Sequence, residues 1–308
     1  MKKRKQQTKI AICYDFDGTL SPDIMQEVSF IPSLGMSSAE FWAEVKQNAR
    51  ESNMDEILAY MNLMIAKATQ KKQPMTLLAL TKHGKNVRMF KGVDSWFSRI
   101  NQYAASLGLQ VEHYVISSGV EEIIRGTSIG KKFNHIFACR FMYHDRRAVQ
   151  PATAVNYTNK TQFLFRINKG IFNYYENEAV NQYMPDEEKY VNFSNMIYIG
   201  DGETDVPCMK MVMYQGGKAI AVYNPEKKGR GEIRDADGKV ISQAKKSAKE
   251  MAMELYKHNR ADFIAPTDYS ENSRIETIVK NIIDGISVQT KCIDLKKQID
   301  REIAEEAG

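Results

Sequence analysis

The apolar positions of this chain fall into short continuous runs that alternate with stretches of helical spacing. The continuous runs predict buried strands at 8–14, 111–119, 135–143, 195–200, 218–223 and 261–266. The helical spacings between them predict helices within 93–108, 120–128, 161–184 and 247–259, with Gly170 as a break in the third. Strands that alternate with helices are typical of a doubly wound, parallel-sheet α/β fold of the Rossmann-like kind.

Two segments do not follow this alternation. Residues 21–91 show helical apolar spacing throughout, with a helix start near Ser38, and residues 273–306 have a helical pattern that ends in charged residues. We therefore predict an α/β core formed by 1–20 and 92–270. A helical domain, 21–91, is inserted into this core, and 271–308 form a C-terminal helical extension.

Composition and charge narrow the class of protein. The sequence contains no run of about 20 apolar residues and no signal-peptide pattern, so we expect neither a membrane partner nor export. The four cysteines are scattered, which favours reduced thiols in a cytoplasmic protein.

The net charge of +5 is concentrated at the N-terminus. Residues 1–9 hold five basic residues and no acid: Lys2, Lys3, Arg4, Lys5 and Lys9. Such a basic tail could touch nucleic acid or a membrane, but a solvated chain end is the simpler interpretation. The sequence shows no stacking aromatics organised for nucleic acid, which argues against that partner.

The carboxyl ends of parallel strands meet at one edge of a sheet, where ligands bind. The residues at these ends are Asp15, Asp17, Thr19, Ser117, Ser118, Gly119, Asp201 and Asp205, with Lys160 at a predicted helix start. Four carboxylates at one edge repel one another, and a divalent cation resolves the conflict. An all-oxygen site without a His or Cys cluster suits Mg²⁺. A carboxylate can attack phosphorus, and a second one can transfer the protons.

The segments "DFDGTL", "VISSG", a lysine at a helix start and "IGDGETDVPCM" resemble the four motifs of the haloacid dehalogenase superfamily, in the family's order. The resemblance implies that Asp15 is the nucleophile and Asp17 the general acid/base. It implies that Mg²⁺ is held by Asp15, the backbone carbonyl of Asp17 and Asp201, with Asp205 orienting the metal site. Ser117 would bind phosphate, with Gly18, Thr19, Ser118 and Gly119 around it.

Two lysines fit the position of the motif lysine. Lys160 is followed by apolar residues at +3, +4 and +7, as the family's helix would require, whereas Lys169 matches this spacing less well but stands in a K-G pair. We favour Lys160 and keep Lys169 as the alternative.

The helical insertion resembles the C1-type cap of the phosphoserine-phosphatase-like subgroup. By that resemblance, Glu27 would meet a substrate amine, and Arg50 or Arg88 could meet a substrate anion. Each of the three could instead form an ordinary surface ion pair.

Together these features predict a Mg²⁺-dependent phosphatase that hydrolyses a small phosphorylated metabolite through an aspartyl-phosphate on Asp15. A phosphotransferase or phosphomutase of the same superfamily is the first alternative, and a non-catalytic binding or regulatory protein on this scaffold is the second. A dehalogenase is disfavoured because such enzymes typically lack the second aspartate, which Asp17 supplies here.

Overall fold

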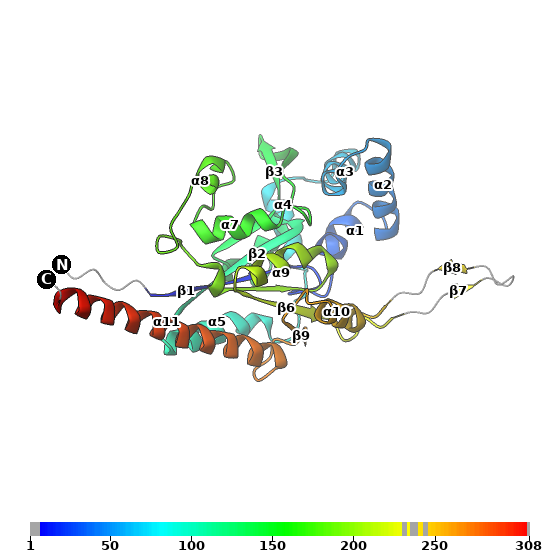
Figure 1. The fold of residues 1–308 in the computed structure, drawn as a ribbon. Coiled ribbons are helices and arrows are strands. Elements are labelled where there is room, and N and C mark those ends of the chain that lie inside the picture. The colour runs from blue at the N-terminus through cyan, green and yellow to red at the C-terminus, as the bar shows by residue number, and fades with distance from the viewer. Residues whose placement is uncertain (1–6, 230–232, 235–239, 243–245, 307–308) are drawn as a thin grey trace.

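A seven-stranded sheet forms the centre of the molecule (Figure 1). The computed structural model describes residues 7–229, 233–234, 240–242 and 246–306. The sheet runs in the order β4-β3-β2-β1-β5-β6-β9, and all neighbouring strands are parallel except β3 and β4. The strands are β1 (Lys9–Tyr14), β2 (Gln110–Val120), β3 (His135–His144), β4 (Arg147–Thr153), β5 (Met196–Gly200), β6 (Lys218–Tyr223) and β9 (Phe263–Pro266). The predicted doubly wound α/β fold is confirmed.

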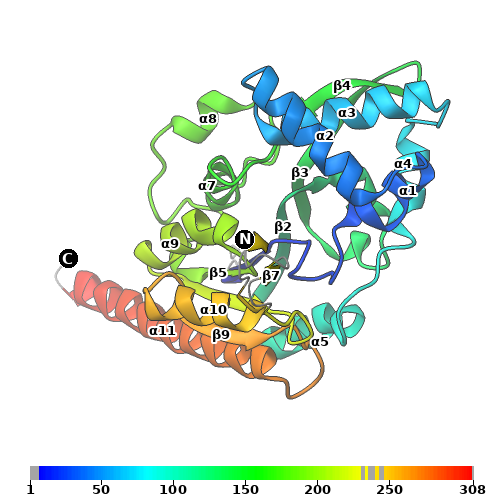
Figure 2. The same cartoon turned by 90° about the vertical axis from the view of Figure 1, so that its right-hand side faces the viewer.

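Helices cover both faces of the sheet because the order of strands reverses at β1. Right-handed crossovers toward β2 and β3 place α5 (Val93–Ser106) and α6 (Glu121–Gly126) on one face. Crossovers in the other direction place α7 (Thr161–Lys169), α9 (Val206–Tyr214) and α10 (Ala248–Lys257) on the opposite face (Figure 2). The reversal makes the carboxyl end of β1 the expected ligand position.

The edge of the sheet carries a hairpin that the sequence pattern does not show. β3 turns back through Asp145 and Arg146 into β4, which pairs antiparallel with it. The residues of β4, "RAVQPAT", have little apolar character and include Pro151, so no strand was predicted there. The hairpin also contacts the helical insertion, since the Ala148 N–H donates to the Met75 carbonyl at 2.7 Å.

The insertion is helical, as its spacing predicts. It contains a π-helical turn η1 (Gln26–Phe30), α1 (Ile31–Ser33), α2 (Ser38–Glu51), α3 (Glu56–Gln70) and α4 (Leu77–Gly84). A capping box at Ser37 and Glu40 starts α2, next to the predicted start at Ser38. Helices α2 and α3 stand together on the opposite side of the molecule from α11 (Arg274–Glu306) (Figures 1 and 2). Helix α4 instead packs on core helix α6, where Gly84 and Gly126 allow the close approach.

The long predicted helix at 161–184 ends early. Helix α7 stops at Lys169, because Gly170 adopts a left-handed conformation with φ near 72°. Only a short α8 (Asn177–Asn181) follows before the 3-10 turn η3 (Phe193–Asn195) leads into β5. Because of this irregular stretch, the segment between Lys160 and Asp201 is longer than one helix and a short loop would require.

The two ends of the chain differ from one another. Lys9 belongs to β1, where its ammonium group contacts the Glu112 carboxylate at 3.1 Å, so the proposed basic tail cannot extend through residue 9. Residues 1–6 lie outside the described residues. The charged segment 226–238 is predicted from its sequence to be a loop, and 230–232 and 235–238 of it also lie outside the described residues; within it, β7 (Ile233–Arg234) pairs with β8 (Val240–Ser242). At the other end, α11 forms the helical extension and packs on α5.

Within the described ranges, every helix is too short or too polar to cross a membrane.

Candidate active site

Three carboxylates meet at the carboxyl ends of the two central strands. Asp15 directly follows β1, Asp201 follows β5, and Asp205 closes the 3-10 turn η4 (Glu203–Asp205). Each of the three offers an oxygen within 4.8 Å of the others. The parallel pairing of β1 with β5 produces this meeting, because it places the two strand ends side by side.

Two glycines, which lack a side chain, provide the space that the Asp201 and Asp205 carboxylates occupy. A Cβ on Gly18 would lie 2.1 Å from Oδ2 of Asp201, and a Cβ on Gly200 would lie 2.4 Å from Oδ2 of Asp205. Gly18 also has a φ of +80°, which other residues rarely adopt. Only glycine therefore allows the backbone to approach the carboxylates so closely.

Lys160 is the cation of this cluster. Its side chain is 1% exposed, and its Nζ lies 3.2 Å from Oδ2 of Asp15 and 2.8 Å from Oδ1 of Asp205. The Tyr198 hydroxyl donates to the same Asp205 oxygen at 2.8 Å. Burial disfavours the charged form of Lys160, but the charges of Asp15 and Asp205 outweigh burial and raise its pKa above the usual range.

Lys169 lies elsewhere. It is in the last turn of α7, and its ammonium group donates to the carbonyls of Val180 and Gln182. Of the two lysines kept open by the sequence, the structure thus brings Lys160 to the carboxylates and directs Lys169 to the loop after α7.

Asp15, Asp17 and Asp201 hold their protons more tightly than free aspartates, because the pKa of each is raised. Burial raises the pKa of Asp15 to about 6, with Lys160 opposing and Asp205 adding to this effect. Burial, together with the charges of Asp15 and Asp205, raises the pKa of Asp201 to about 8. The pKa of Asp17 lies well above its usual range because of burial and the nearby charge of Asp15.

A cavity of ≈ 270 Å³ opens above this cluster. Its floor brings together six of the predicted site residues, with Thr204 beside them: Asp15, Asp17, Ser117, Ser118, Gly119 and Lys160. Asp17 accepts a hydrogen bond from the Met25 N–H at 3.2 Å, and Ser117 Oγ accepts one from the Gly119 N–H at 3.1 Å. Thr19 is fully buried beneath the turn, where its carbonyl accepts the Tyr269 hydroxyl at 2.9 Å.

The helical insertion supplies the opposite wall of the cavity. Its contributions are Ile24, Gln26, Trp42, Glu56, Ile57 and Tyr60, and Tyr157 joins them from the loop before α7. Tyr60 also ties the insertion to the core, since its hydroxyl donates to the Ser118 carbonyl at 2.8 Å. Helical apolar spacing does not distinguish positions in the core from positions in a pocket, so these wall residues could not be predicted from it.

The three insertion residues expected to meet substrate are placed differently. Glu27 accepts the indole N–H of Trp42 at 2.6 Å and does not itself line the cavity. Arg88 is exposed and forms a two-pronged pair with Asp23. Arg50 lies exposed in the last turn of α2. Arg88 thus forms the surface ion pair named above as its alternative role, and the role of Arg50 stays a prediction.

The donor set fits a hard divalent cation. The three acids supply only oxygen, and Oδ2 of Asp205 is buried without a hydrogen-bond partner. A buried carboxylate oxygen without a partner is costly, and a cation would satisfy it. Asp15, Asp201 and Asp205 are therefore the residues that could hold Mg²⁺, which prefers carboxylate oxygens.

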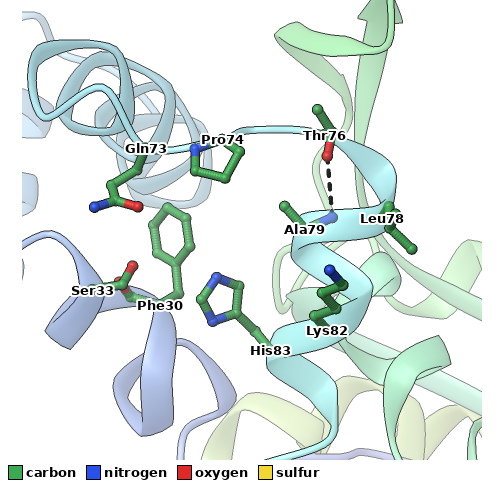
Figure 3. A pocket seen from close by; sticks show the side chains of 9 residues that line it. All are labelled: Phe30, Ser33, Gln73, Pro74, Thr76, Leu78, Ala79, Lys82 and His83. Carbon is green, nitrogen blue, oxygen red and sulfur yellow. Dashed lines mark hydrogen bonds between the residues drawn. The ribbon is translucent and has the colours of Figure 1, made fainter.

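A second cavity in the described part of the chain has a different lining. This cavity of ≈ 380 Å³ lies between α1 and α4, with Phe30, Pro74 and His83 around it (Figure 3). No carboxylate and no strand end contributes to its lining. The carboxylate cluster at the sheet edge is the better candidate for an active site.

The fold is that of the haloacid dehalogenase-like hydrolases. The family's sequence model matches residues 12–210, which is more than half of the chain, so the chain belongs to this family and the predicted membership is confirmed. The matched range contains Asp15, Ser117, Lys160, Asp201 and Asp205.

Individual proteins that resemble this chain share less than a third of its residues. An uncharacterised protein of Borreliella burgdorferi is 28% identical over 233 residues, or 68% of this chain and 80% of that protein. A probable phosphoserine phosphatase from Vibrio cholerae shares the fold with a TM-score of 0.51 at 11% identity, covering 92% of this chain and 67% of that one. A hydrolase of the family from Salmonella enterica serovar Typhi is 18% identical with a TM-score of 0.48; the match covers 71% of this chain and 64%, less than two thirds, of that one.

Proposed function

We propose that this protein is a Mg²⁺-dependent phosphatase that hydrolyses a small phosphomonoester through an aspartyl-phosphate on Asp15. The observation that carries the proposal is the buried lysine shared by Asp15 and Asp205 at the floor of a cavity. Lys160 keeps Asp15 close to a fixed positive charge, as a carboxylate nucleophile approaching an anionic phosphate requires. We further propose that the enzyme acts in the cytoplasm.

In the first half-reaction, a carboxylate oxygen of Asp15 attacks phosphorus while the bond from phosphorus to the ester oxygen breaks. The leaving alcohol oxygen takes a proton from Asp17, whose raised pKa favours the protonated form before the step. Ser117 lies on the cavity floor, where its hydroxyl can donate to a phosphoryl oxygen.

In the second half-reaction, Asp17 is now a carboxylate and takes a proton from water. The resulting hydroxide attacks phosphorus, the bond from phosphorus to Asp15 breaks, and inorganic phosphate leaves. A bound Mg²⁺ would neutralise charge on the phosphoryl oxygens throughout. The insertion covers the cavity with Trp42, Ile57 and Tyr60 and so limits the access of bulk water.

The test is release of nitrophenolate from p-nitrophenyl phosphate, measured with Mg²⁺ and with a chelator. We expect turnover that depends on Mg²⁺, that Asp15→Asn abolishes and that Asp145→Asn leaves intact, since Asp145 is 93% exposed on the hairpin turn. An active Asp15→Asn variant with a native circular dichroism spectrum would contradict the nucleophile. Transfer of phosphate to added glycerol in preference to water would instead support the phosphotransferase alternative.

A further inference from the structure

The wall of the cavity facing the phosphate site is aromatic and acidic. Trp42 and Tyr60 meet edge to face, with ring centroids 5.9 Å apart and planes at 70°. Tyr157 also lines the cavity and is 44% exposed, and Glu56 contributes a carboxylate from the start of α3. Two rings at a steep angle can contact a compact cationic group from two sides. A flat aromatic group, in contrast, could stack on only one of them.

The environment of Trp42 strengthens this preference. Its indole N–H donates to the carboxylate of Glu27 at 2.6 Å, and Glu27 is not among the residues that line the cavity. The carboxylate draws the N–H proton toward itself and so leaves the indole ring richer in electrons. An electron-rich ring attracts a cation more strongly.

Cationic side chains are scarce in the same cavity. Of the residues lining it, Lys160 alone carries positive charge, and both Asp15 and Asp205 already contact its ammonium group. Arg88 is paired with Asp23 and Arg50 is exposed on α2, so neither lines the cavity. A carboxylate on the leaving group would therefore lose its water without gaining a partner.

One buried polar group in the wall still lacks a partner. Gln26 is 2% exposed and lines the cavity, and its Oε1 has no hydrogen-bond partner. An amide oxygen accepts hydrogen bonds and carries partial negative charge. A donor or a positive charge on the substrate would satisfy it.

We propose that the leaving group of the substrate is a small alcohol that carries an alkylammonium group and no carboxylate. The phosphoryl group lies on the floor at Asp15, and the ammonium group lies among Trp42, Tyr60 and Glu56. The cavity of ≈ 270 Å³ matches a small ester, since pockets for drug-sized ligands begin at roughly 300 Å³. This assignment rests on the phosphatase function proposed above.

The test compares four esters on the Mg²⁺-loaded full-length protein: phosphocholine, phosphoethanolamine, phosphoserine, and dimethylbutyl phosphate, in which carbon replaces the ammonium nitrogen of phosphocholine. We expect kcat/KM for phosphocholine to exceed that for its carbon analogue by about tenfold, within the range of cation–π attraction. Phosphoserine should fall about tenfold or more below phosphoethanolamine, because its carboxylate is buried without a partner.

A matched pair of variants locates the effect. Glu56→Gln should reduce the ratio of kcat/KM for phosphocholine to kcat/KM for its carbon analogue by about threefold. This is the effect expected when one partly exposed contact between opposite charges is lost. Glu51→Gln, on the exposed end of α2, should leave that ratio unchanged.

The outcomes separate the two proposals. Mg²⁺-dependent hydrolysis of p-nitrophenyl phosphate with equal turnover of the charged and carbon esters would overturn the ammonium site and leave the phosphatase standing. Phosphoserine turned over as well as phosphoethanolamine would do the same. If no ester is hydrolysed, the phosphatase proposal fails. Calorimetric binding of phosphocholine and its carbon analogue would then decide the ammonium site, with equal affinities counting against it.

Discussion

Replacing Asp201 by asparagine should make the metal-free protein more stable and should remove most of the stabilisation that Mg²⁺ provides. The pKa of Asp201 is raised to about 8 by burial and by the charges of Asp15 and Asp205. At pH 7 the folded protein therefore keeps a proton on this carboxyl group, which the unfolded chain releases. Taking up this proton at pH 7 destabilises the folded state. An asparagine at position 201 is always neutral, so the variant folds without this cost.

The magnitude follows from the size of the shift. Each pH unit between the unfolded and folded pKa values is worth about 1.4 kcal/mol. The interval from the ordinary pKa of 3.8 to pH 7 sets an upper limit of about 4 kcal/mol on the destabilisation. Because the side chain keeps partial contact with solvent, we expect a gain of about 1–3 kcal/mol for Asp201→Asn without metal.

The sign of the pH dependence follows from the raised pKa. The folded protein binds more protons than the unfolded chain, so stability due to this group falls as the pH rises from about 4 to about 8 and stays constant above that. Asp201→Asn should remove this slope and therefore show its largest gain near pH 8. Mg²⁺ at a hundredfold excess over its dissociation constant should stabilise the wild type by about 2.7 kcal/mol and the variant much less.

The assay is urea unfolding, followed by circular dichroism at pH 5 and pH 8, with chelator and with Mg²⁺. Asp145→Asn is the matched control, because the same substitution on an exposed turn should leave both the slope and the response to Mg²⁺ unchanged. The reasoning is refuted if Asp201→Asn is less stable than the wild type in chelator at pH 8, or if Mg²⁺ stabilises both proteins equally.

Other predictions concern the lysines and the first glycine of the site. Lys160→Met should lower the free energy of unfolding by about 3–5 kcal/mol in urea, because it leaves the buried charges of Asp15 and Asp205 without their cation. Lys169→Ala should cost at most about 1 kcal/mol and leave kcat/KM within about twofold, and a larger loss of activity than in Lys160→Met would reverse the assignment. Gly18→Ala should abolish the rise in melting temperature with Mg²⁺, since its Cβ would lie 2.1 Å from an Asp201 oxygen; an unchanged rise would contradict the role of this close approach.

The meeting of the acids at one edge could be predicted from the sequence. Asp15 and Asp201 each follow a continuous apolar run, and parallel strands in a doubly wound sheet place such ends together. The helical phase of the apolar residues after Lys160 likewise indicated which lysine lies at the sheet. These inferences depend on local patterns and on one topological rule.

The wall of the cavity could not be predicted in the same way. The contact of Glu27 with Trp42 joins residues on separate helices, and no periodic pattern encodes how η1 and α2 are oriented. Strand β4 was missed because its pairing with β3 depends on a turn at Asp145 and Arg146 and on support from Met75. In both cases tertiary contacts, which a single sequence does not display, decide the result.

The turn that follows Asp15 is held by a residue far along the chain. The Tyr269 hydroxyl bonds the Thr19 carbonyl, and the Tyr269 carbonyl accepts from Arg99, whose guanidinium also pairs with buried Glu276 of α11. During synthesis, Asp15 is made within the first few per cent of the chain, but the contact between Thr19 and Tyr269 can form only after residue 269 has left the ribosome. The turn after Asp15 therefore lacks this one contact until the last strand and the final helix dock. Truncations within α11 should consequently disturb the position of Asp15, although the contact between Thr19 and Tyr269 joins residues that are 250 positions apart.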